Sequence, residues 1–250
     1  MELARAPRRE AVRSGGRPGG EEGGREGRGG GPAAVSSLSH SGPPRAGRLS
    51  ALATRAFDVA AALVLLPLTL PLLLAGLAVV AASGGAPLFF GHRRVGKGGR
   101  TFRCWKLRTM QVDAETRLVQ EPELHRLHRE NGFKIPASRD PRIIPGGRWL
   151  RRTHLDELPQ LFNVLVGDMS LLGPRPVVEQ ELGLYGEHRD LILSVRPGIL
   201  GEWTSRGRRR PPYPERARLE AEWVRERGLG RNLRILFRSV GAVLSGQEEG

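Results

Sequence analysis

The sequence predicts a mainly helical α+β protein with a re-entrant membrane helix-break-helix, a small β-hairpin and amphipathic helices at the membrane interface. The first observation is an apolar run, residues 59–82, that carries no charged side chain. The second is a pair of short β-prone runs around a glycine-rich turn, within residues 88–112. The third is a series of helical patterns from residue 113 to the C-terminus, without internal repeats.

Composition divides the chain near residue 50. Residues 1–50 are dominated by Gly, Pro, Ser, Arg and Glu and have few large apolar side chains. Such a segment buries too little surface to offset the entropy of ordering it, so we expect a disordered tail. It does not resemble a secretory signal, because no apolar core follows Met1. Residues 51–250 are enough for one compact domain.

The excess of positive charge lies mostly on this domain. The chain has 40 Lys and Arg against 26 Asp and Glu, a net charge of +14. Nine Arg and five Glu in residues 1–50 account for +4, which leaves +10 for residues 51–250. A basic surface suits nucleic acid, anionic lipid or phosphorylated substrates, and charge alone does not choose among them.

A single cysteine, Cys104, excludes an internal disulfide framework and a cysteine-based zinc site. This fits a protein of the reducing cytoplasm. Cys104 itself is expected to be a small buried residue of the core.

The apolar run from Val59 to Ala82 is long enough to enter a bilayer. Its 24 residues would extend about 36 Å as a helix, against a hydrocarbon core of about 30 Å. Pro67 and Pro71 lie in the middle, where each removes a backbone hydrogen bond and bends a helix. Basic residues flank both ends: Arg45, Arg48 and Arg55 before the run, and Arg93, Arg94, Lys97, Arg100 and Arg103 after it.

The basic flanks decide how this run should meet the membrane, because positive residues favour the cytoplasmic side. A single span would export one cluster, whereas a re-entrant helix over about residues 56–82 exports neither. We therefore expect a segment that enters and leaves by the same face, with its break at Pro67 and Pro71. A kinked single span is the alternative. A soluble core helix is disfavoured because the run is apolar on all sides.

The β-hairpin is predicted from Leu88-Phe89-Phe90 and from Thr101 to Trp105, with Gly96-Lys97-Gly98-Gly99 as its turn. The glycine spacing does not fit a phosphate-binding P-loop, and no helical pattern follows it directly. We therefore interpret the glycines as a turn.

Helical patterns make up most of the remainder. We expect helices over residues 113–131, 155–165, 214–227 and 231–244, and a loop over 169–176. Pro159 suits the first turn of the second helix and Gly167 its stop. The last helix places apolar side chains beside several arginines, which suits a membrane interface, although a core-facing helix has the same pattern.

The adjacent carboxylates Asp156 and Glu157 are the candidate catalytic pair. Position alone favours a structural role, because acids complement a helix start and Asp can cap its free N–H groups. Thr153 with Asp156 also resembles a capping box. The functional interpretation depends on nearby cations. These are Arg148, Arg151 and Arg152 before the pair, Arg175 in a Gly-Pro-Arg-Pro loop, and Lys106 and Arg108 at the end of the hairpin.

Carboxylates among many cations suit phosphoryl transfer, since Arg and Lys side chains hold phosphate oxygens. A carboxylate can attack phosphorus to form an acyl-phosphate, while a divalent cation offsets charge on the transferring group. One acid would be the nucleophile, with the other on Mg²⁺ or in proton transfer. Glycoside hydrolysis also uses two acids, but neighbours on one turn suit it less. The adjacent His154 is expected to be structural.

Several motifs follow one another in a fixed order. They are Thr54-Arg55-Ala56-Phe57-Asp58, Trp105-Lys106-Leu107-Arg108-Thr109-Met110, Asp140-Pro141-Arg142, Leu150-Arg151-Arg152-Thr153-His154-Leu155-Asp156-Glu157-Leu158-Pro159-Gln160, Gly167-Asp168-Met169-Ser170-Leu171-Leu172-Gly173-Pro174-Arg175-Pro176 and Arg196-Pro197-Gly198-Ile199. Over residues 54–245 the chain resembles the bacterial sugar transferases, the monotopic polyprenyl-phosphate phosphoglycosyltransferases. The fourth and fifth motifs, in this order and spacing, are the most specific part of the resemblance.

The resemblance implies an activity and a location. Members of this family transfer a sugar 1-phosphate from a nucleotide-diphosphate sugar, usually a UDP-sugar, to polyprenyl (undecaprenyl) phosphate and release UMP. This is the first membrane step of exopolysaccharide, capsule, O-antigen or glycoprotein glycan synthesis. It takes place at the cytoplasmic face of the inner membrane, on a re-entrant helix. A homodimer and downstream glycosyltransferases are the expected protein partners.

The resemblance also assigns roles to residues. Asp156 would be the nucleophile that carries a phosphosugar intermediate, and Glu157 would support Mg²⁺ (or Mn²⁺) or proton transfer, with Asp156 as a second metal ligand. Basic residues in the motifs would bind phosphate or substrate: Lys106, Arg108, Arg151, Arg175 and Arg196. Residues 51–250 would then be the catalytic domain. Many members carry several spanning helices before this module, and we expect the minimal module here.

Some positions depart from the family pattern. Leu70 precedes Pro71 where the family has Ser, which removes a hydroxyl that could satisfy backbone groups at the break. His154 stands where Ser or Asn is usual, and Asn232 where Asp is common. The Arg- and Pro-rich residues 207–214 also differ. These changes bear on donor specificity and C-terminal docking more than on the reaction.

Two other functions remain as alternatives. A non-catalytic membrane adaptor would use the basic faces without needing the acids. A nucleic-acid binder is not expected, because the Arg208-Arg209-Arg210 run lacks the interleaved aromatics that stack on bases.

Overall fold

The computed structural model describes residues 48–130, 135–202 and 211–244. The chain divides into residues 1–40 and 41–250, and everything below concerns the second unit. The predicted tail over residues 1–50 therefore lies almost wholly outside the described residues, as do residues 207–210 of the Arg- and Pro-rich segment 207–214.

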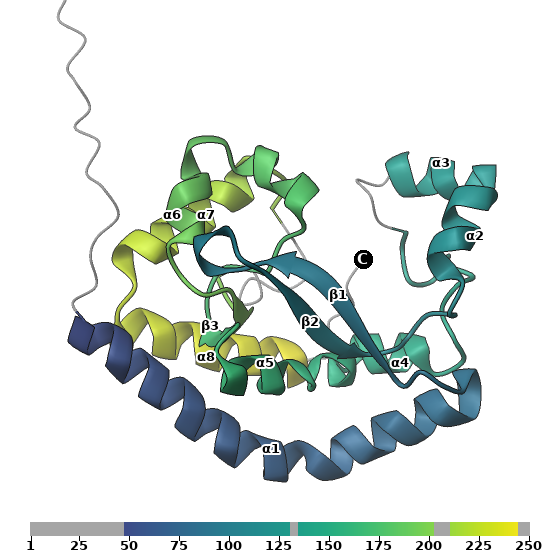
Figure 1. Cartoon of the computed structure of the whole chain (residues 1–250), viewed down its shortest axis with the longest axis horizontal. Helices are drawn as coiled ribbons and strands as arrows, with labels where there is room; N and C mark the ends of the chain where they lie inside the picture. Colours follow the sequence, from purple (N-terminus) through teal and green to yellow (C-terminus); the bar gives the residue numbers. More distant parts are fainter. Residues whose placement is uncertain (1–47, 131–134, 203–210, 245–250) are drawn as a thin grey trace, which may run out of the picture. The chain divides into compact units, whose positions relative to one another are not determined.

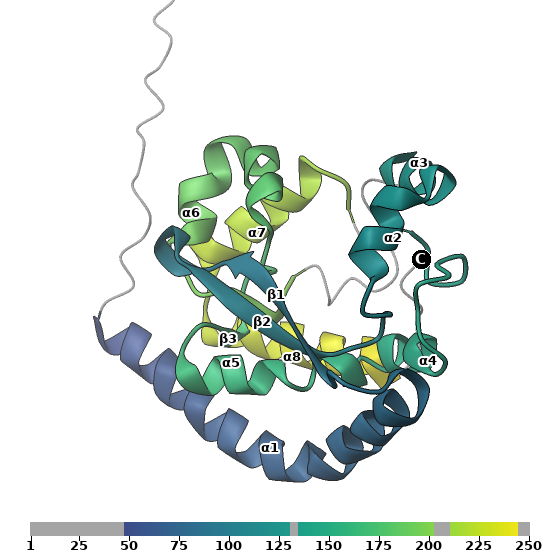
Figure 2. The ribbon, with the colours of Figure 1, turned by 45° about the vertical axis from the view of Figure 1, so that its right-hand side comes forward.

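The apolar run forms the middle of one long helix, α1 (Arg48–Gly84), of 37 residues. Figures 1 and 2 show α1 as an arc, with the rest of the unit on its concave side. Pro67 and Pro71 lie inside it, and between them Thr69 Oγ1 donates to the Leu65 carbonyl at 2.7 Å. Both features bend helices. The predicted helix-break-helix is thus one continuous, bent helix.

Charged side chains tie the N-terminal part of α1 to the rest of the unit. Arg55 donates to the Val164 and Leu165 carbonyls at 2.5 and 2.7 Å. Asp58, which is 2% exposed, accepts hydrogen bonds from Ser170 Oγ at 2.9 Å and from the Leu171 N–H at 3.0 Å. Arg55 thus provides donors for carbonyls near the end of the helix that contains Val164. Ser170 and Leu171 provide the hydrogen bonds that the buried Asp58 carboxylate needs.

The C-terminal end of α1 is held by Arg108. Its guanidinium donates to the carbonyls of Gly84, Gly85 and Ala86 at 2.5, 2.7 and 3.3 Å. An arginine suits this position because it satisfies terminal carbonyls and complements the helix dipole. Both ends of α1 are thus bonded to the same folded body.

The middle of α1 is apolar and largely uncovered. Residues 49–84 form a helix long and apolar enough to cross a membrane, with a mean hydropathy of 2.6 and 17% of its most apolar window buried. Exposed large side chains include Leu63, Val64, Leu68, Leu70, Leu72 and Leu74. Such an exposed apolar surface indicates a membrane or protein contact.

The predicted β-hairpin is confirmed as β1 (Phe89–Val95) and β2 (Thr101–Leu107), which pair antiparallel. The turn between them is η1 (Lys97–Gly99), with Gly98 and Gly99 at φ of 67° and 78°. Glycine adopts this left-handed conformation without steric cost, so the glycines serve the turn as expected.

One strand of a second pair lies within the predicted loop 169–176, and its partner lies where no element was predicted. β3 (Ser170–Leu172) pairs in parallel with β4 (Gly198–Leu200). The backbones of the two paired segments approach so closely that a Cβ on Gly198 would lie 2.0 Å from the Gly173 nitrogen. Strands of three residues carry too little periodicity to be predicted, and their pairing partner is distant in sequence.

The remaining helices follow the predictions in part. Their bounds are α2 (Ala114–Gln120), α3 (Pro122–Glu130), α4 (Gly147–Arg152), η2 (Leu155–Glu157), α5 (Gln160–Val166), η3 (Glu179–His188), α6 (Arg189–Leu193), α7 (Glu215–Glu226) and α8 (Leu229–Leu244). The single helix expected over 113–131 is divided at Pro122, where a helix can begin but not continue. α4, η3 and α6 were not predicted.

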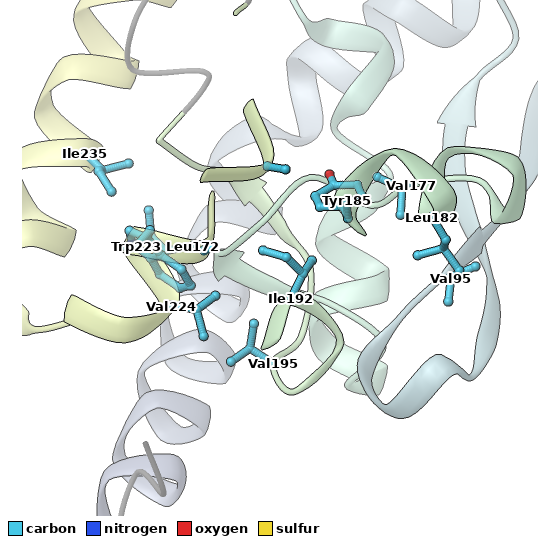
Figure 3. Packing of buried hydrophobic residues seen from close by; sticks show 12 residues of the cluster. Val95, Leu172, Val177, Leu182, Tyr185, Ile192, Val195, Trp223, Val224 and Ile235 are labelled. Carbon is cyan, nitrogen blue, oxygen red and sulfur yellow. The ribbon is translucent and has the colours of Figure 1, made fainter. Parts of the chain in front are cut away.

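Three apolar clusters hold the unit together. Two lie against α1: one joins Ala62 to α5, and the other joins Leu73 and Val80 to Leu107 of β2. The third, shown in Figure 3, packs η3 and α6 against α7 and α8. Ile235 of α8 belongs to this cluster.

The outer side of α8 presents a different surface. Leu233 and Phe237 are 43% and 73% exposed, and Arg234 and Arg238 are exposed beside them. The core-facing interpretation therefore holds for one side of this helix. The other side keeps the apolar and basic composition of an interfacial helix.

A buried polar network lies next to the third cluster. Tyr185 Oη donates to Glu220 Oε2 at 2.7 Å, and Arg216 Nε donates to Glu220 Oε1 at 3.3 Å. Glu220 is 1% exposed, and it also accepts a hydrogen bond from the Arg175 backbone N–H. One carboxylate of α7 thus joins η3 to the Gly-Pro-Arg-Pro loop.

We expect Glu220→Ala to destabilise the fold by about 3–5 kcal/mol, because it leaves a buried arginine without its partner. At roughly 2–4 °C per kcal/mol, the melting temperature of the solubilised protein should fall by several degrees. Glu187→Ala is the control, since that side chain is 88% exposed. Equal shifts for the two variants would show that the network contributes nothing.

Candidate active site

Asp156 and Glu157 lie on a tight turn between two short helices. The 3-10 turn η2 carries both acids, after α4 and before α5 begins at Gln160. His154 enters this turn at φ 56°, the only non-glycine residue with positive φ among those described. This left-handed conformation is uncommon outside glycine, and His is among the residues that adopt it more readily.

The turn does not support a capping role for the acids. Neither η2 nor α5 has a side-chain cap. Thr153 Oγ1 donates backward to the Trp149 carbonyl at 2.9 Å and so takes no part in a capping box. The helix-cap interpretation that position alone favoured is therefore wrong, and the predicted helix over 155–165 begins only at Gln160.

A small pocket opens beside the pair. Its lining residues are Arg94, Cys104, Lys106, Glu157, Gln160, Arg175, Pro176, Gly198 and Ile199. The enclosed space is about 20 Å³, room for about one water molecule. Lys106 Nζ lies 2.5 Å from Glu157 Oε1. The Lys106–Glu157 ion pair thus lines this small pocket.

The two carboxyl groups differ in proton affinity. Burial raises the pKa of Asp156 to about 6; the Glu157 charge adds to this, while Lys106 and Arg151 oppose it. Burial also acts to raise the pKa of Glu157, but the charge and hydrogen bond of Lys106, aided by Arg175, outweigh it and lower that pKa to about 2. Glu157 is therefore an anion at neutral pH, and Asp156 is the more basic carboxylate.

Three of the predicted cations gather around the acids. Lys106 and Arg175 line the pocket. Arg151 is half-buried near Asp156, whose charge acts to raise the pKa of the guanidinium. Its Nε donates to Thr109 Oγ1 at 2.8 Å. Their positions agree with a site for phosphate oxygens.

Arg108 and Arg196, predicted to bind substrate, hold backbone carbonyls instead. Arg108 anchors the end of α1 as described above, and Arg196 Nε donates to the Gly167 carbonyl at 2.8 Å, just after α5. Neither lines the pocket. Their motifs contribute through neighbours, since Lys106 precedes Arg108 by two residues and Gly198 follows Arg196 by two. Both arginines thus support the backbone near the site, and their predicted contact with substrate stays a prediction.

Sequence reasoning missed other residues of the pocket. Arg94, which the sequence places only in the basic flank of the apolar run, lines the pocket. Cys104 is buried, as expected of a core residue, and it also lines the pocket. The hairpin register could have identified Arg94. It pairs with Phe102, and alternation places it on the same face as Cys104 and Lys106.

The acids suit a divalent cation of the expected kind. Among the described residues, no group of three or more His, Cys, Asp or Glu could hold a metal. Mg²⁺ is commonly held by one or two carboxylates together with substrate phosphates and water. Asp156 and Glu157 offer that donor set, and Glu157 remains charged at neutral pH.

Comparison with known proteins agrees with the motifs. The family described as "Bacterial sugar transferase" matches residues 49–246. A UDP-galactose-lipid carrier transferase of Erwinia amylovora is 40% identical over 193 residues, 76% of this chain and 40% of that protein. An undecaprenyl-phosphate galactose phosphotransferase of Salmonella typhimurium is 39% identical over 200 residues, 79% of this chain and 41% of that protein.

A shorter relative matches over most of its length. The exopolysaccharide production protein ExoY of Rhizobium meliloti is 40% identical over 199 residues, 78% of this chain and 87% of that protein. The chain thus spans about two fifths of the first two relatives and most of the third. The chain belongs to the bacterial sugar transferase family.

Asp156→Asn should stabilise the metal-free protein at pH 7.5. The raised pKa means that ionising Asp156 in the folded state costs free energy, and this penalty is complete above pH 6. It disappears as pH falls toward the ordinary value of 3.8, so the gain should shrink between pH 6 and pH 4. Melting temperatures in a chelator would measure it. A variant that melts below wild type at pH 7.5 would contradict the assigned burial cost.

Proposed function

We propose that this chain transfers a sugar 1-phosphate from a UDP-sugar to undecaprenyl phosphate, giving undecaprenyl-diphosphate-sugar and UMP. One arrangement carries the proposal: a buried Asp156 of raised pKa next to a Glu157 that is ionised at neutral pH, in a pocket of cations beside an exposed apolar helix. The names of the relatives, which include a phosphotransferase acting on undecaprenyl phosphate, agree with it.

The proposed reaction has two displacements at one phosphorus. An Asp156 carboxylate oxygen bonds to the β-phosphorus of the donor while the bond to the bridging oxygen breaks, and UMP leaves with that oxygen. An oxygen of the lipid phosphate then bonds to the same phosphorus and releases the carboxylate. Two displacements through an acyl-phosphate divide one difficult step into two easier ones.

The other pocket residues stabilise charge during these displacements. Lys106 and Arg175 would hold phosphate oxygens, and Arg151 would stabilise the ionised form of Asp156 before attack. Mg²⁺, held by Glu157 with Asp156, would neutralise the diphosphate and its leaving group. A glycosidase does not need this concentration of positive charge, because its sugar substrate is neutral.

The proposed membrane arrangement is monotopic, at the cytoplasmic face of the inner membrane. α1 would enter and leave by the same face, supported by its bend and by the polar clamps that bind both its ends to one body. Exposed apolar side chains also occur on α4 and α5, which contact α1, and on α8: Trp149, Phe162, Val166, Leu233 and Phe237. These would lie at the interface.

The proposed biological role is the first membrane step of a surface glycan such as an exopolysaccharide. ExoY, the shorter relative, is named for exopolysaccharide production. Downstream glycosyltransferases would use the product, and a homodimer is the other partner we propose. Two relatives are named for galactose and one for N-acetylgalactosamine, so the donor is best sought with a panel of UDP-sugars.

Asp156→Asn should abolish UMP release from a UDP-sugar in the presence of undecaprenyl phosphate and Mg²⁺, by about 10³-fold or more. Mass spectrometry should find a phosphosugar adduct on the peptide containing Asp156 when the acceptor is omitted. Asp190→Asn, at an exposed position, is the control and should retain activity. Full activity of Asp156→Asn would refute the nucleophile, and function without either acid would favour the membrane adaptor.

Cysteines placed at the start of α1 and in the hairpin turn that follows it should react from the same side of the membrane. Ser50→Cys and Lys97→Cys are at exposed positions, and the native Cys104 is 1% exposed. A membrane-impermeant thiol reagent should label both variants in inverted vesicles and neither in intact spheroplasts. Leu70→Cys, in the apolar middle, should remain unlabelled in both. Labelling of the two ends from opposite sides would establish a single span.

A further inference from the structure

Arg94 reaches the pocket from the opposite strand of the hairpin. It lines the pocket with Lys106 and Arg175, and the register places it on the Lys106 face of the hairpin. Its neighbour Arg93 pairs with Arg103 on the other face and is exposed. Two adjacent arginines therefore have different surroundings, and only Arg94 lies at the candidate active site.

The polar contacts of Arg94 are long for a cationic side chain that is only 18% exposed. Nη1 donates to the Pro176 carbonyl at 3.3 Å and lies 4.0 Å from Glu181 Oε2. Charge-assisted hydrogen bonds of arginine are normally about 2.7–2.9 Å long. Glu181 Oε2 is itself buried without a hydrogen-bond partner among the described residues. The pair is thus close enough to attract but too far apart to bond.

The surroundings of Arg94 disfavour a cation unless an anion joins it. Burial, followed by the nearby charge of Arg175, lowers the pKa of the Arg94 guanidinium, and Glu181 offsets this only in part. A phosphate group between Arg94 and Arg175 would supply the missing negative charge. Arginine is suited to this task because its planar fork can hold two phosphate oxygens at once.

We propose that Arg94 is a third phosphate-binding side chain of the pocket, and that Glu181 is its counter-charge while the pocket is empty. The proposal deepens the proposed function, because it gives the diphosphate of the donor a further contact on the hairpin. When the anion binds, Arg94 exchanges its long contact with Glu181 for short hydrogen bonds to phosphate oxygens. Glu181 therefore competes with the ligand and weakens its binding.

This competition distinguishes a ligand-binding role from a structural one. If Arg94 binds phosphate, Arg94→Met should weaken binding and Glu181→Gln should strengthen it. If Arg94 only anchors the loop through Pro176, the two substitutions should not shift anion affinity in opposite directions. In the Arg94→Met background, Glu181→Gln should have no further effect, because the two side chains act as one pair.

Calorimetric titration of the full-length protein in nanodiscs with inorganic pyrophosphate tests the proposal without turnover. We expect Arg94→Met to raise the Kd by about 10–100-fold, the loss of one or two charge-assisted hydrogen bonds. Arg93→Met, the matched control, should stay within twofold of wild type, and Glu181→Gln should lower the Kd severalfold. Melting temperatures check that each variant is folded. Glu181→Gln is nearly isosteric with the native residue, so it still tests the proposal if Arg94→Met does not fold.

Each outcome bears on the proposal. Failure of wild type to bind pyrophosphate would overturn it, as would unchanged affinity in both Arg94→Met and Glu181→Gln, or an equal loss in Arg93→Met. UMP release, assayed separately, keeps the two proposals apart. Pyrophosphate binding that depends on Arg94, without UMP release from any UDP-sugar, would support the binding site and refute the transferase reaction.

Discussion

Three charged side chains, Arg55, Asp58 and Arg108, fix a 37-residue apolar helix to a polar body at both of its ends. The rest of the structure depends on these clamps. An apolar helix gains nothing from contact with polar surfaces, and its own terminal carbonyls need partners. The three side chains provide these interactions. Arg55 and Arg108 donate to carbonyls at the ends of α5 and α1, and the Asp58 carboxylate of α1 accepts hydrogen bonds from β3. The bend between them allows both ends to reach one body.

The clamps also connect the apolar helix to the site. Arg108 directly follows β2, two residues beyond Lys106, so the segment that binds the end of α1 also brings a cation to Glu157. Arg55 binds α5, whose first residue Gln160 lines the pocket. A lipid phosphate held near the helix would therefore lie close to the acids. The proposed reaction, between a soluble donor and a lipid acceptor, requires this proximity.

The dyad shows how neighbouring carboxyl groups acquire different properties. Asp156 faces the interior and Glu157 faces Lys106, so burial dominates one pKa and ion pairing the other. Adjacent residues on a regular helix would point about 100° apart and could both face solvent. The η2 turn, entered through the left-handed His154, instead buries one acid and leaves the other partly exposed among cations. His154 contributes its left-handed backbone to this turn, and its charge also acts to lower the pKa of Glu157.

The Gly-Pro-Arg-Pro loop is supported from a distant part of the chain. Glu220 of α7 accepts the Arg175 backbone N–H and binds Tyr185 and Arg216. Residue 177, just after the loop, is bridged to the hairpin through the Val95 N–H at 2.9 Å. The loop is thus held from two sides, which positions Arg175 at the pocket. A loop of glycine and prolines gains rigidity in this way from its neighbours.

The sequence by itself determined the bent apolar helix, the hairpin with its glycine turn, and the Asp156–Glu157 pair with Lys106, Arg151 and Arg175. Each of these follows from local composition or from contiguous motifs. The contacts of Arg94, Arg108 and Arg196 emerged only from the tertiary structure, because an arginine beside a motif can face either a pocket or a carbonyl. The tertiary structure likewise paired β3 with β4 and placed the acids on a turn instead of a helix start. Strand pairing over about 30 residues and the burial of one acid depend on contacts that no local pattern contains.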